Sequence, residues 1–345
     1  MPVLTGIFYG YTKENYKKQK NSPSFISLTH AEISMTAPID RPNNKSKGKS
    51  VQSDPFKVKL ICSFISFFST MPAFVGRGFA WFFAVCSKLF RTRSYTTSIK
   101  NLSLCCAEKS EKDRERIAFA SLKHTGKLFF EVAKIWRKCQ GERFIGRIYG
   151  EELVKDTLDN NQGVLFTGSH IGNWEVALYY LGSRFPFHCM YRPPRQQEMD
   201  EVINVGRCQN DTTMVKGDSR GVMHLINILK SGEVAAVLSD QEPGRRAGVF
   251  VPFCGKEALT MTIVQRIQQK SNAHLFQVAA IKSDDDLYDI RLIPIDIDMQ
   301  ASEEEYAEEV NKQLEMMIKK YPEQYQWSYK RFKTTECGGP NPYQK

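Results

Sequence analysis

Short apolar runs alternate with amphipathic segments along the chain after residue 150. The apolar runs, bounded by turn residues, predict strands at 164–167, 188–191, 214–215, 234–238, 249–253, 275–281 and 289–295. Apolar residues at three- to four-residue spacing predict helices at 174–181, 198–208, 220–230, 261–269 and 303–319. This alternation is typical of a mostly parallel sheet. The sequence therefore predicts an α/β fold with a mostly parallel central sheet flanked by helices.

Before residue 150 the pattern is helical. Residues 113–138 place Phe119, Phe129 and Trp136 on one side of a predicted helix and charges on the other. Further upstream, residues 60–76 form a run of 17 uncharged residues, and after Arg77 the apolar pattern continues through 78–85. Three interpretations stay open: a short transmembrane helix, a helical hairpin lying partly in one leaflet, or a pair of soluble core helices.

Composition separates the start of the chain from the rest. Residues 1–52 are rich in lysine, asparagine, serine and proline and lack the apolar core of a cleavable signal, so we predict a flexible basic segment without a catalytic role. A misassigned start is the alternative. We expect a membrane-anchoring helical segment at 53–92, a catalytic α/β domain at 93–335, and a flexible tail at 336–345.

Charge and cysteine content narrow the partners. The formal net charge is +10, and residues 84–150 carry 15 Lys and Arg against 6 Asp and Glu, beside the most apolar segment. That placement favours an anionic membrane surface over nucleic acid, for which the sequence shows no recognisable module. The nine cysteines show no Cys-x2-Cys pair, which indicates reduced thiols on the cytosolic side.

The strongest chemical signal is a histidine followed five residues later by a glutamate. His170 comes just after the predicted strand 164–167, and Glu175 falls in the first turns of the following helix. If His170 lies on the turn, the two side chains can meet, and the carboxylate would hold the imidazole in one tautomer as a base. The alternative is a capped strand–helix junction with a chance glutamate.

Several blocks, in this order, resemble the bacterial late acyltransferases of lipid A biosynthesis, the lauroyl and myristoyl transferase type of the lysophospholipid acyltransferase superfamily. The resemblance covers about residues 55–335. Its blocks are His170-Ile-Gly-Asn-Trp-Glu175, Met190-Tyr-Arg-Pro-Pro194, the helix ending near Gly206-Arg207, Ser239-Asp-Gln-Glu-Pro-Gly-Arg-Arg246, Gly248–Gly255, Tyr321–Trp327 and Lys330–Lys333.

The resemblance implies an acyl-carrier-protein-dependent transfer to a hydroxyl of a lipid A precursor, forming a secondary acyloxyacyl ester. It also implies an N-terminal membrane anchor, a location at the inner membrane of a Gram-negative bacterium with the site on the cytoplasmic side, and no cofactor beyond the acyl donor. Other lipid acceptors (a lysophospholipid, an ornithine lipid or a glycolipid) and a catalytically inactive membrane-binding homologue stay as alternatives.

The chemistry assigns a role to each candidate residue. His170 is the predicted base and Glu175 its orienting carboxylate, with no covalent acyl-enzyme because no Gly-x-Ser-x-Gly elbow is present. The turn at Gly172-Asn173 offers backbone N–H groups for an oxyanion, and the Asn173 side chain could add a donor or simply start the helix.

Arginines beside prolines are the candidate phosphate-binding residues: Arg192 and Arg195 around Pro193-Pro194, and Arg245 and Arg246 after Pro243-Gly244. Solvated surface charge is the alternative for all four. Asp240 and Gln241 are expected to hold the loop or the arginines by hydrogen bonds. His170, Arg192 and Asp240-Gln241 each follow a predicted strand, so we expect them to converge at one sheet edge. The scattered histidines predict no metal site.

Overall fold

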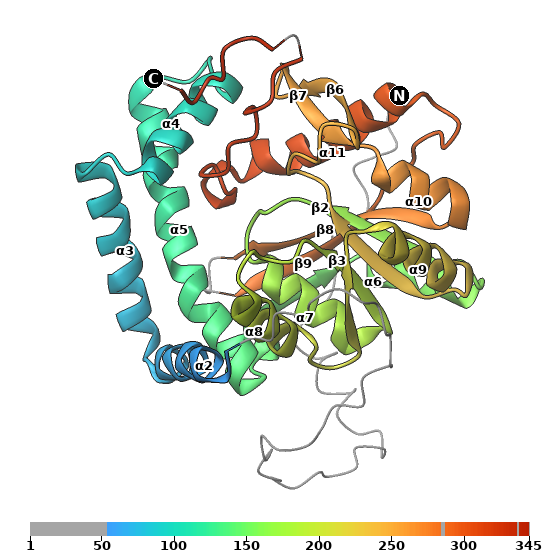
Figure 1. The fold of residues 1–345 in the computed structure, drawn as a ribbon, viewed down its shortest axis with the longest axis horizontal. Helices are drawn as coiled ribbons and strands as arrows, with labels where there is room; N and C mark the ends of the chain where they lie inside the picture. Colours follow the sequence, from blue (N-terminus) through green and yellow to red (C-terminus); the bar gives the residue numbers. More distant parts are fainter. Residues whose placement is uncertain (1–53, 284–286, 337, 345) are drawn as a thin grey trace, which may run out of the picture. The chain divides into compact units, whose positions relative to one another are not determined.

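A computed structural model of the chain describes residues 54–283, 287–336 and 338–344. The basic segment predicted at 1–52 lies outside the described residues. The described part opens with α-helices and continues as an α/β unit (Figure 1).

The centre of the molecule is a seven-stranded sheet in the order β1-β9-β8-β2-β5-β3-β4. Neighbours from β8 to β4 pair in parallel, whereas β9 pairs with β8 antiparallel and β1 follows β9 in parallel. The strands are β1 (Ile145–Tyr149), β2 (Val164–Gly168), β3 (Phe187–Tyr191), β4 (Thr212–Lys216), β5 (Val234–Leu238), β8 (His274–Lys282) and β9 (Tyr288–Pro294). The mostly parallel sheet is as predicted.

Helices cover both faces because the central strands are apolar on both sides. One core contains side chains of α6 (Glu151–Asp159) and α7 (Trp174–Arg184), and another contains those of α9 (Ser219–Lys230), α10 (Ile263–Ser271) and α11 (Glu303–Lys320). In β2, all five residues are buried. The α/β part also contains α8 (Gln197–Arg207) and the short 3-10 helices η2 (Gly141–Phe144) and η3 (Pro322–Gln324).

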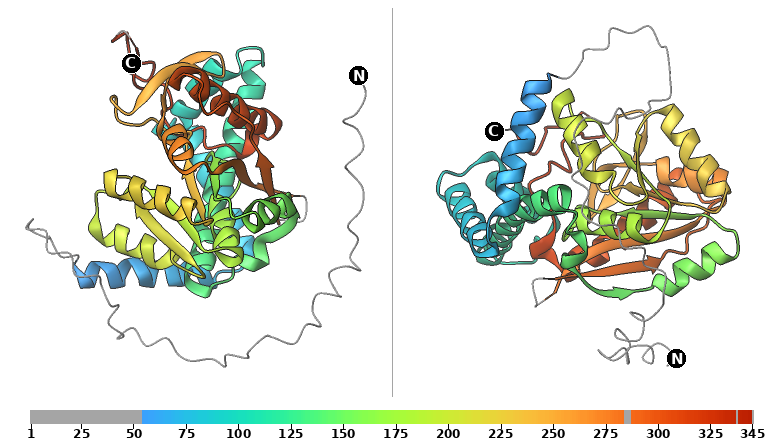
Figure 2. Two further views of the ribbon diagram at one scale, coloured as in Figure 1. Left: turned by 90° about the vertical axis from the view of Figure 1, so that its right-hand side faces the viewer. Right: turned by 90° about the horizontal axis from the view of Figure 1, so that it is seen from below.

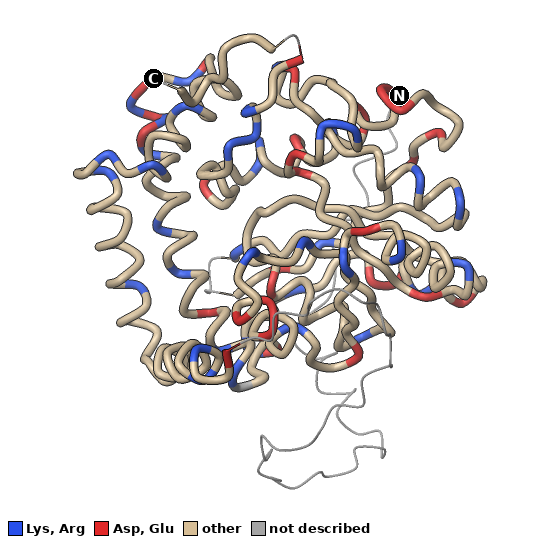
Figure 3. Tube along the Cα trace, in the orientation of Figure 1, with Lys and Arg blue, Asp and Glu red and all other residues tan. Residues whose placement is uncertain are grey.

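In the part of the chain that the structure describes, four helices precede the sheet: α2 (Pro55–Thr70), α3 (Ala73–Leu89), α4 (Arg93–Cys105) and α5 (Glu111–Lys138). Asp54 caps α2 by accepting a hydrogen bond from the N–H of Phe56, and the chain turns at Pro72 before α3. Helices α2 and α3 pack against α5, and α2 also lies beside α8 (Figure 2). Charged residues are sparse along α3 (Figure 3).

The apolar segment forms two helices with many exposed aromatic side chains. Phe64, Phe67, Phe74, Trp81 and Phe82 are all exposed. Within the described residues no single helix is long and apolar enough to cross a bilayer; α2 and α3 meet that test only as a pair, bent by 111°.

One predicted strand does not belong to the sheet. Residues 249–253 lie in β6 (Gly248–Phe253), which pairs antiparallel with β7 (Lys256–Met261) as a separate hairpin. Val251 and Phe253 of β6 are buried, the strand packs against α11, and the Asn311 side chain donates to the Pro252 carbonyl. The apolar run at 249–253 therefore predicted a strand correctly, but it did not predict which strand it pairs with.

Candidate active site

Two turns meet at one edge of the sheet. Strands β2 and β5 are parallel neighbours with Gly168 opposite Leu238, so the turns that follow them lie side by side. The N–H of Ser239 donates to the Gly168 carbonyl over 3.0 Å, which ties the turns together. The first turn carries His170 and the second carries Asp240 and Gln241, so these three residues converge as expected.

Asp240 holds His170 through both its backbone and its ring. The N–H of His170 donates to Asp240 Oδ2 over 2.9 Å, and Nδ1 lies 2.8 Å from Oδ1. A carboxylate accepts, so Nδ1 carries the proton and Nε2 is left with its lone pair. Gln241 Nε2 lies 3.3 Å from that nitrogen, and the Trp174 ring packs edge-on against the imidazole. The arrangement presents a base at Nε2.

The electrostatics favour an ionised Asp240. Burial alone would raise the pKa of Asp240, but the neighbouring imidazole and the hydrogen bonds from His170 outweigh burial and lower that pKa. The carboxyl is therefore charged at neutral pH, and it can stabilise an imidazolium when Nε2 takes a proton.

The predicted pairing of Glu175 with His170 is wrong. The Glu175 carboxylate accepts from Arg207 on α8 through Nε over 3.1 Å and through Nη2, and from Trp136 Nε1 over 3.0 Å. Gly206 makes this possible, since a Cβ there would lie 2.5 Å from the Trp136 ring. Glu175 lies in the first turn of α7 and faces α5 and α8, so its side chain is directed away from the turn.

The predicted oxyanion donors at 172–173 are already used. The N–H of Gly172 donates to the Gln324 carbonyl over 3.0 Å, and that of Asn173 donates to Ala280 over 2.9 Å. The Asn173 side chain caps α7 through its oxygen and donates its amide to Glu131 over 2.9 Å. These groups hold the turn in place and are not directed at a substrate.

The turn itself requires a glycine. Gly172 has a φ of 58°, and a Cβ there would lie 1.8 Å from the Ala280 carbonyl oxygen. The Gly172 carbonyl accepts from His124 Nε2 of α5 at 2.9 Å. Burial lowers the pKa of His124 to about 4, so this ring is neutral at pH 7 and serves as a donor.

The chain after α11 closes the other side of the site. The N–H of Gln326 donates to the His170 carbonyl over 3.0 Å. Glu242, which directly follows Gln241 and is buried, accepts from the N–H groups of Lys333 and Thr334, while its own N–H donates to the Tyr329 hydroxyl. The loop that carries Asp240 is thus held from two directions.

The model of the bacterial lipid A biosynthesis acyltransferase family matches residues 54–334. The chain belongs to this family. It is 30% identical over 250 residues to a lipid A biosynthesis lauroyltransferase of Escherichia coli K12, covering 71% of this chain and 80% of that protein. It is 28% identical over 262 residues to the palmitoleoyltransferase of the same strain (74% and 83%), and 26% identical over 257 residues to its myristoyltransferase (71% and 77%). The chain is therefore an acyltransferase.

The four predicted phosphate-binding arginines of this family member are all exposed. Arg192 and Arg195 follow β3, which pairs with β5, so they leave the sheet at the same edge as Asp240. Arg245 donates to the Glu336 carbonyl over 3.1 Å, and Arg246 is next to it. Their exposure leaves the guanidinium groups available to a ligand. Among the residues described, no group of three side chains could hold a metal ion.

Five residues around the turn were missed or given another role: Trp136, Glu131, His124, Arg207 and Glu242. Three of them lie on α5, where the amphipathic pattern predicts packing but does not name a partner. Asp240 had a usable signal, because a carboxylate directly after a buried strand adjacent to β2 must lie near His170. The order of the strands in the sheet was the missing information.

Proposed function

We propose that this chain transfers a fatty acyl group from the thioester of an acyl carrier protein to a hydroxyl of a lipid A precursor, with His170 as the base. The observation that carries the proposal is the His170–Asp240 pair. Its carboxylate is buried, whereas the ring is 20% exposed at the edge where two strand-end loops meet. An oriented base that stays accessible is what an attacking hydroxyl requires.

The reaction takes place in two steps. His170 Nε2 accepts the hydroxyl proton as the oxygen attacks the thioester carbonyl, and Asp240 stabilises the resulting imidazolium from the Nδ1 side. The tetrahedral intermediate then breaks its C–S bond, and the imidazolium returns the proton to the departing thiolate. The Gln241 amide, beside Nε2, is the proposed donor to the developing oxyanion in place of the 172–173 turn.

The family supports the proposed acceptor, a lipid A precursor, and an acyl carrier protein as donor is part of our proposal. The relatives are named for lauroyl, palmitoleoyl and myristoyl transfer in lipid A biosynthesis. We assign the acceptor as a hydroxyl on a 3-hydroxyacyl chain already attached, which yields a secondary acyloxyacyl ester. Arg192, Arg195, Arg245 and Arg246 supply guanidinium groups for the phosphates of that glycolipid.

We also propose attachment to the cytoplasmic face of the inner membrane through α2 and α3. The exposed phenylalanines of this pair have the size and chemistry of an interfacial anchor, and the bend of 111° is compatible with a hairpin that enters one leaflet. Lys88, Arg91 and Arg93, which follow the apolar stretch, are placed to meet anionic head groups.

Removal of the base tests the reaction. Purified His170→Ala protein, given acyl carrier protein thioester and lipid A precursor, should lose about 10²-fold or more of its turnover, measured by mass spectrometry of the product. The matched control is His274→Ala, which removes an exposed imidazole at the start of β8, the opposite end of the sheet. Near-normal turnover in a folded His170→Ala protein would exclude this mechanism.

Vesicle flotation tests the attachment. Replacing exposed Phe74 and Phe82 by glutamine should release a large part of the protein from vesicles of inner-membrane lipids. Met316→Gln, which alters an exposed apolar residue on α11, should not. Release of the unaltered protein by high salt alone would show that the binding is only electrostatic and would contradict the anchor.

A further inference from the structure

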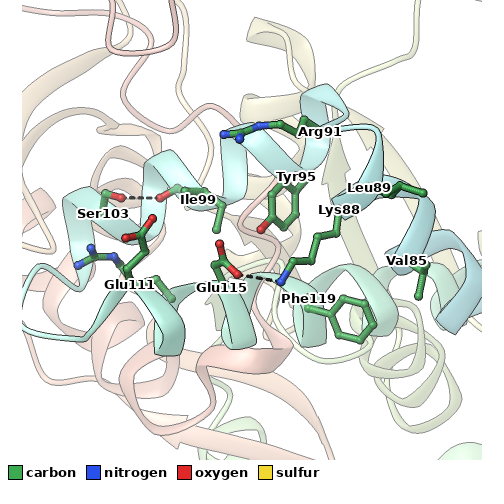
Figure 4. A pocket seen from close by; sticks show the side chains of 11 residues that line it. Val85, Lys88, Leu89, Arg91, Tyr95, Ile99, Ser103, Glu111, Glu115 and Phe119 are labelled. Atoms are coloured by element: carbon green, nitrogen blue, oxygen red, sulfur yellow. Dashed lines mark hydrogen bonds and ion pairs between the residues drawn. The ribbon is translucent and has the colours of Figure 1, made fainter.

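A cavity of about 600 Å³ lies between the end of α3, the start of α4 and the start of α5, apart from the His170 site (Figure 4). Its apolar wall includes Val85, Leu89 and Phe119, and its polar wall includes both cations and carboxylates. The volume is in the range of small-molecule sites. No part of the mechanism above uses this cavity.

Charges of both signs line the cavity. Arg91 and Tyr95 come from the α3–α4 turn and from α4, and Glu111 and Glu115 come from α5 on the facing side (Figure 4). Arg114, which lies between these two glutamates on α5, donates to backbone carbonyls of the α4–α5 loop. Lys88 pairs with Glu115 at 2.8 Å. In contrast, neither the Arg91 guanidinium nor the Glu111 carboxylate makes an ion pair or a side-chain hydrogen bond with any residue that the structure describes. One cation and one anion are therefore left for a ligand.

Arg91 lies on the tight turn between α3 and α4. Its φ is 45°, and its N–H donates to the Lys88 carbonyl over 3.2 Å, while the next N–H returns to Ser87 over 3.0 Å. The hydroxyl of Tyr95, a buried residue, makes no hydrogen bond to another described residue and faces the same space. A guanidinium and a phenol placed together are suitable donors for a phosphate.

The position relative to the apolar helices identifies the source of the ligand. Leu89, which lines the cavity at the end of α3, is 71% exposed, and the next residue, Phe90, is 73% exposed. If α3 meets the membrane as proposed above, the cavity opens at the level of the lipid head groups.

We propose that this cavity binds the zwitterionic head group of a phosphatidylethanolamine molecule. The phosphate contacts Arg91 and the Tyr95 hydroxyl, and the primary ammonium donates to Glu111. The first carbons of the acyl chains lie along Val85 and Leu89. A head group with a phosphate alone would place its charge near two carboxylates, whereas an ammonium next to the phosphate satisfies both signs. This inference rests on the proposed membrane attachment but not on the acyl-transfer mechanism.

Native mass spectrometry of the full-length protein from mixed detergent micelles tests the proposal. The micelles contain equal amounts of phosphatidylethanolamine, phosphatidylcholine and phosphatidylglycerol of distinguishable mass, so neither acyl transfer nor a bilayer is needed. We expect one retained phosphatidylethanolamine, reduced about tenfold by Arg91→Ala and by Glu111→Gln. The matched controls Arg220→Ala and Glu304→Gln alter exposed charges outside the cavity and should retain the lipid.

The other outcomes overturn the proposal. Equal retention of the three lipids would mean that the cavity does not discriminate between head groups. Preference for phosphatidylglycerol would mean that it recognises the phosphate alone. Undiminished retention in both Arg91→Ala and Glu111→Gln would place the lipid elsewhere. Soluble glycerophosphoethanolamine serves as the last arm: if it displaces the lipid at equal concentration, the acyl chains contribute nothing and a membrane lipid is not the ligand.

Discussion

The two sides of the Gly172 turn hold two carboxylates in opposite ways. On one side, buried Asp240 is hydrogen-bonded to the imidazole of His170, the base of the proposed reaction. On the other side, Glu175 forms an ion pair with Arg207. Burial lowers the pKa of Arg207, but the charge of Glu175 and its hydrogen bond outweigh burial, so that this pKa is raised. In the proposed reaction the first pair changes its protonation, whereas the second pair neutralises a buried guanidinium.

This difference separates chemistry from support. A carboxylate beside a titrating group affects the rate, whereas a carboxylate that neutralises a buried guanidinium affects mainly whether the turn keeps its shape. Four measurements would sharpen or break that distinction.

Asp240→Asn should produce the largest effect on turnover. Asparagine keeps the shape but loses the charge that stabilises the imidazolium and fixes its tautomer, so kcat should fall about 10²- to 10⁴-fold. The melting temperature, followed by circular dichroism, should change little. If kcat is preserved in Asp240→Asn but lost in a fully stable Glu175→Gln protein, the two carboxylates have the opposite roles.

Glu175→Gln should act mainly on stability. It leaves a buried guanidinium without its counter-charge, which commonly costs about 3–5 kcal/mol of unfolding free energy. Glu175→Gln combined with Arg207→Met removes both charges and should recover much of that loss in urea unfolding. Strictly additive losses in this double-mutant cycle would show that the pair is not coupled.

His124 should make stability depend on pH in a defined window. The unfolded side chain titrates near 6.5 and the folded one at about 4. Because the unfolded chain binds the proton at the higher pH, stability falls as pH drops from about 6.5 to about 4, by up to about 3 kcal/mol.

His124→Gln keeps a donor for the Gly172 carbonyl and should flatten this part of the curve, whereas His274→Ala should not. Asp240, with its lowered pKa, contributes stability above its unfolded pKa of about 3.9 and loses it only below that, outside the window. An unchanged slope in His124→Gln would assign the pH dependence to other groups.

The exposed arginines should give the smallest effect. Arg246→Ala should raise the KM for a phosphorylated acceptor about tenfold, near the lower limit for a charged contact because the side chain is exposed. Arg246→Lys should recover only part of the lost affinity for the acceptor, since lysine restores the positive charge but not the planar guanidinium that can donate two hydrogen bonds at once. Arg220→Ala on α9 is the control. An equal loss for a dephosphorylated acceptor would mean that Arg246 holds the loop or contacts the carrier protein.

Sequence periodicity predicted most of the fold because strands such as β2 and β5 are buried on both faces and leave an uninterrupted apolar run. It missed β1 and β7, whose residues 145–149 and 256–261 mix apolar with polar side chains. It also missed α4 and α6, which carry few apolar residues. Strand order is a property of long-range packing, so the pattern could not assign β6 to its own hairpin.

The convergence of His170 with Asp240 and Gln241 was predictable from the sequence, because each of these residues directly follows a predicted strand. The pairing was not, because a spacing of five residues suggested Glu175 as the partner while α7 turns that side chain towards Arg207. Likewise, no local signal indicates that the N–H groups of Gly172 and Asn173 donate to the carbonyls of Gln324 and Ala280, which lie more than 100 residues away in the sequence.

Residues 324–334, which contact His170 and Glu242, are among the last to be synthesised, so the structure around the site can be completed only late. A chain emerges from the ribosome N-terminus first, so α2 and α3 are available to a membrane long before these residues exist. The loop with Asp240 stays without its support until the segment after α11 has been made. A newly made molecule therefore exposes α2 and α3 first and completes the support of its candidate active site afterwards.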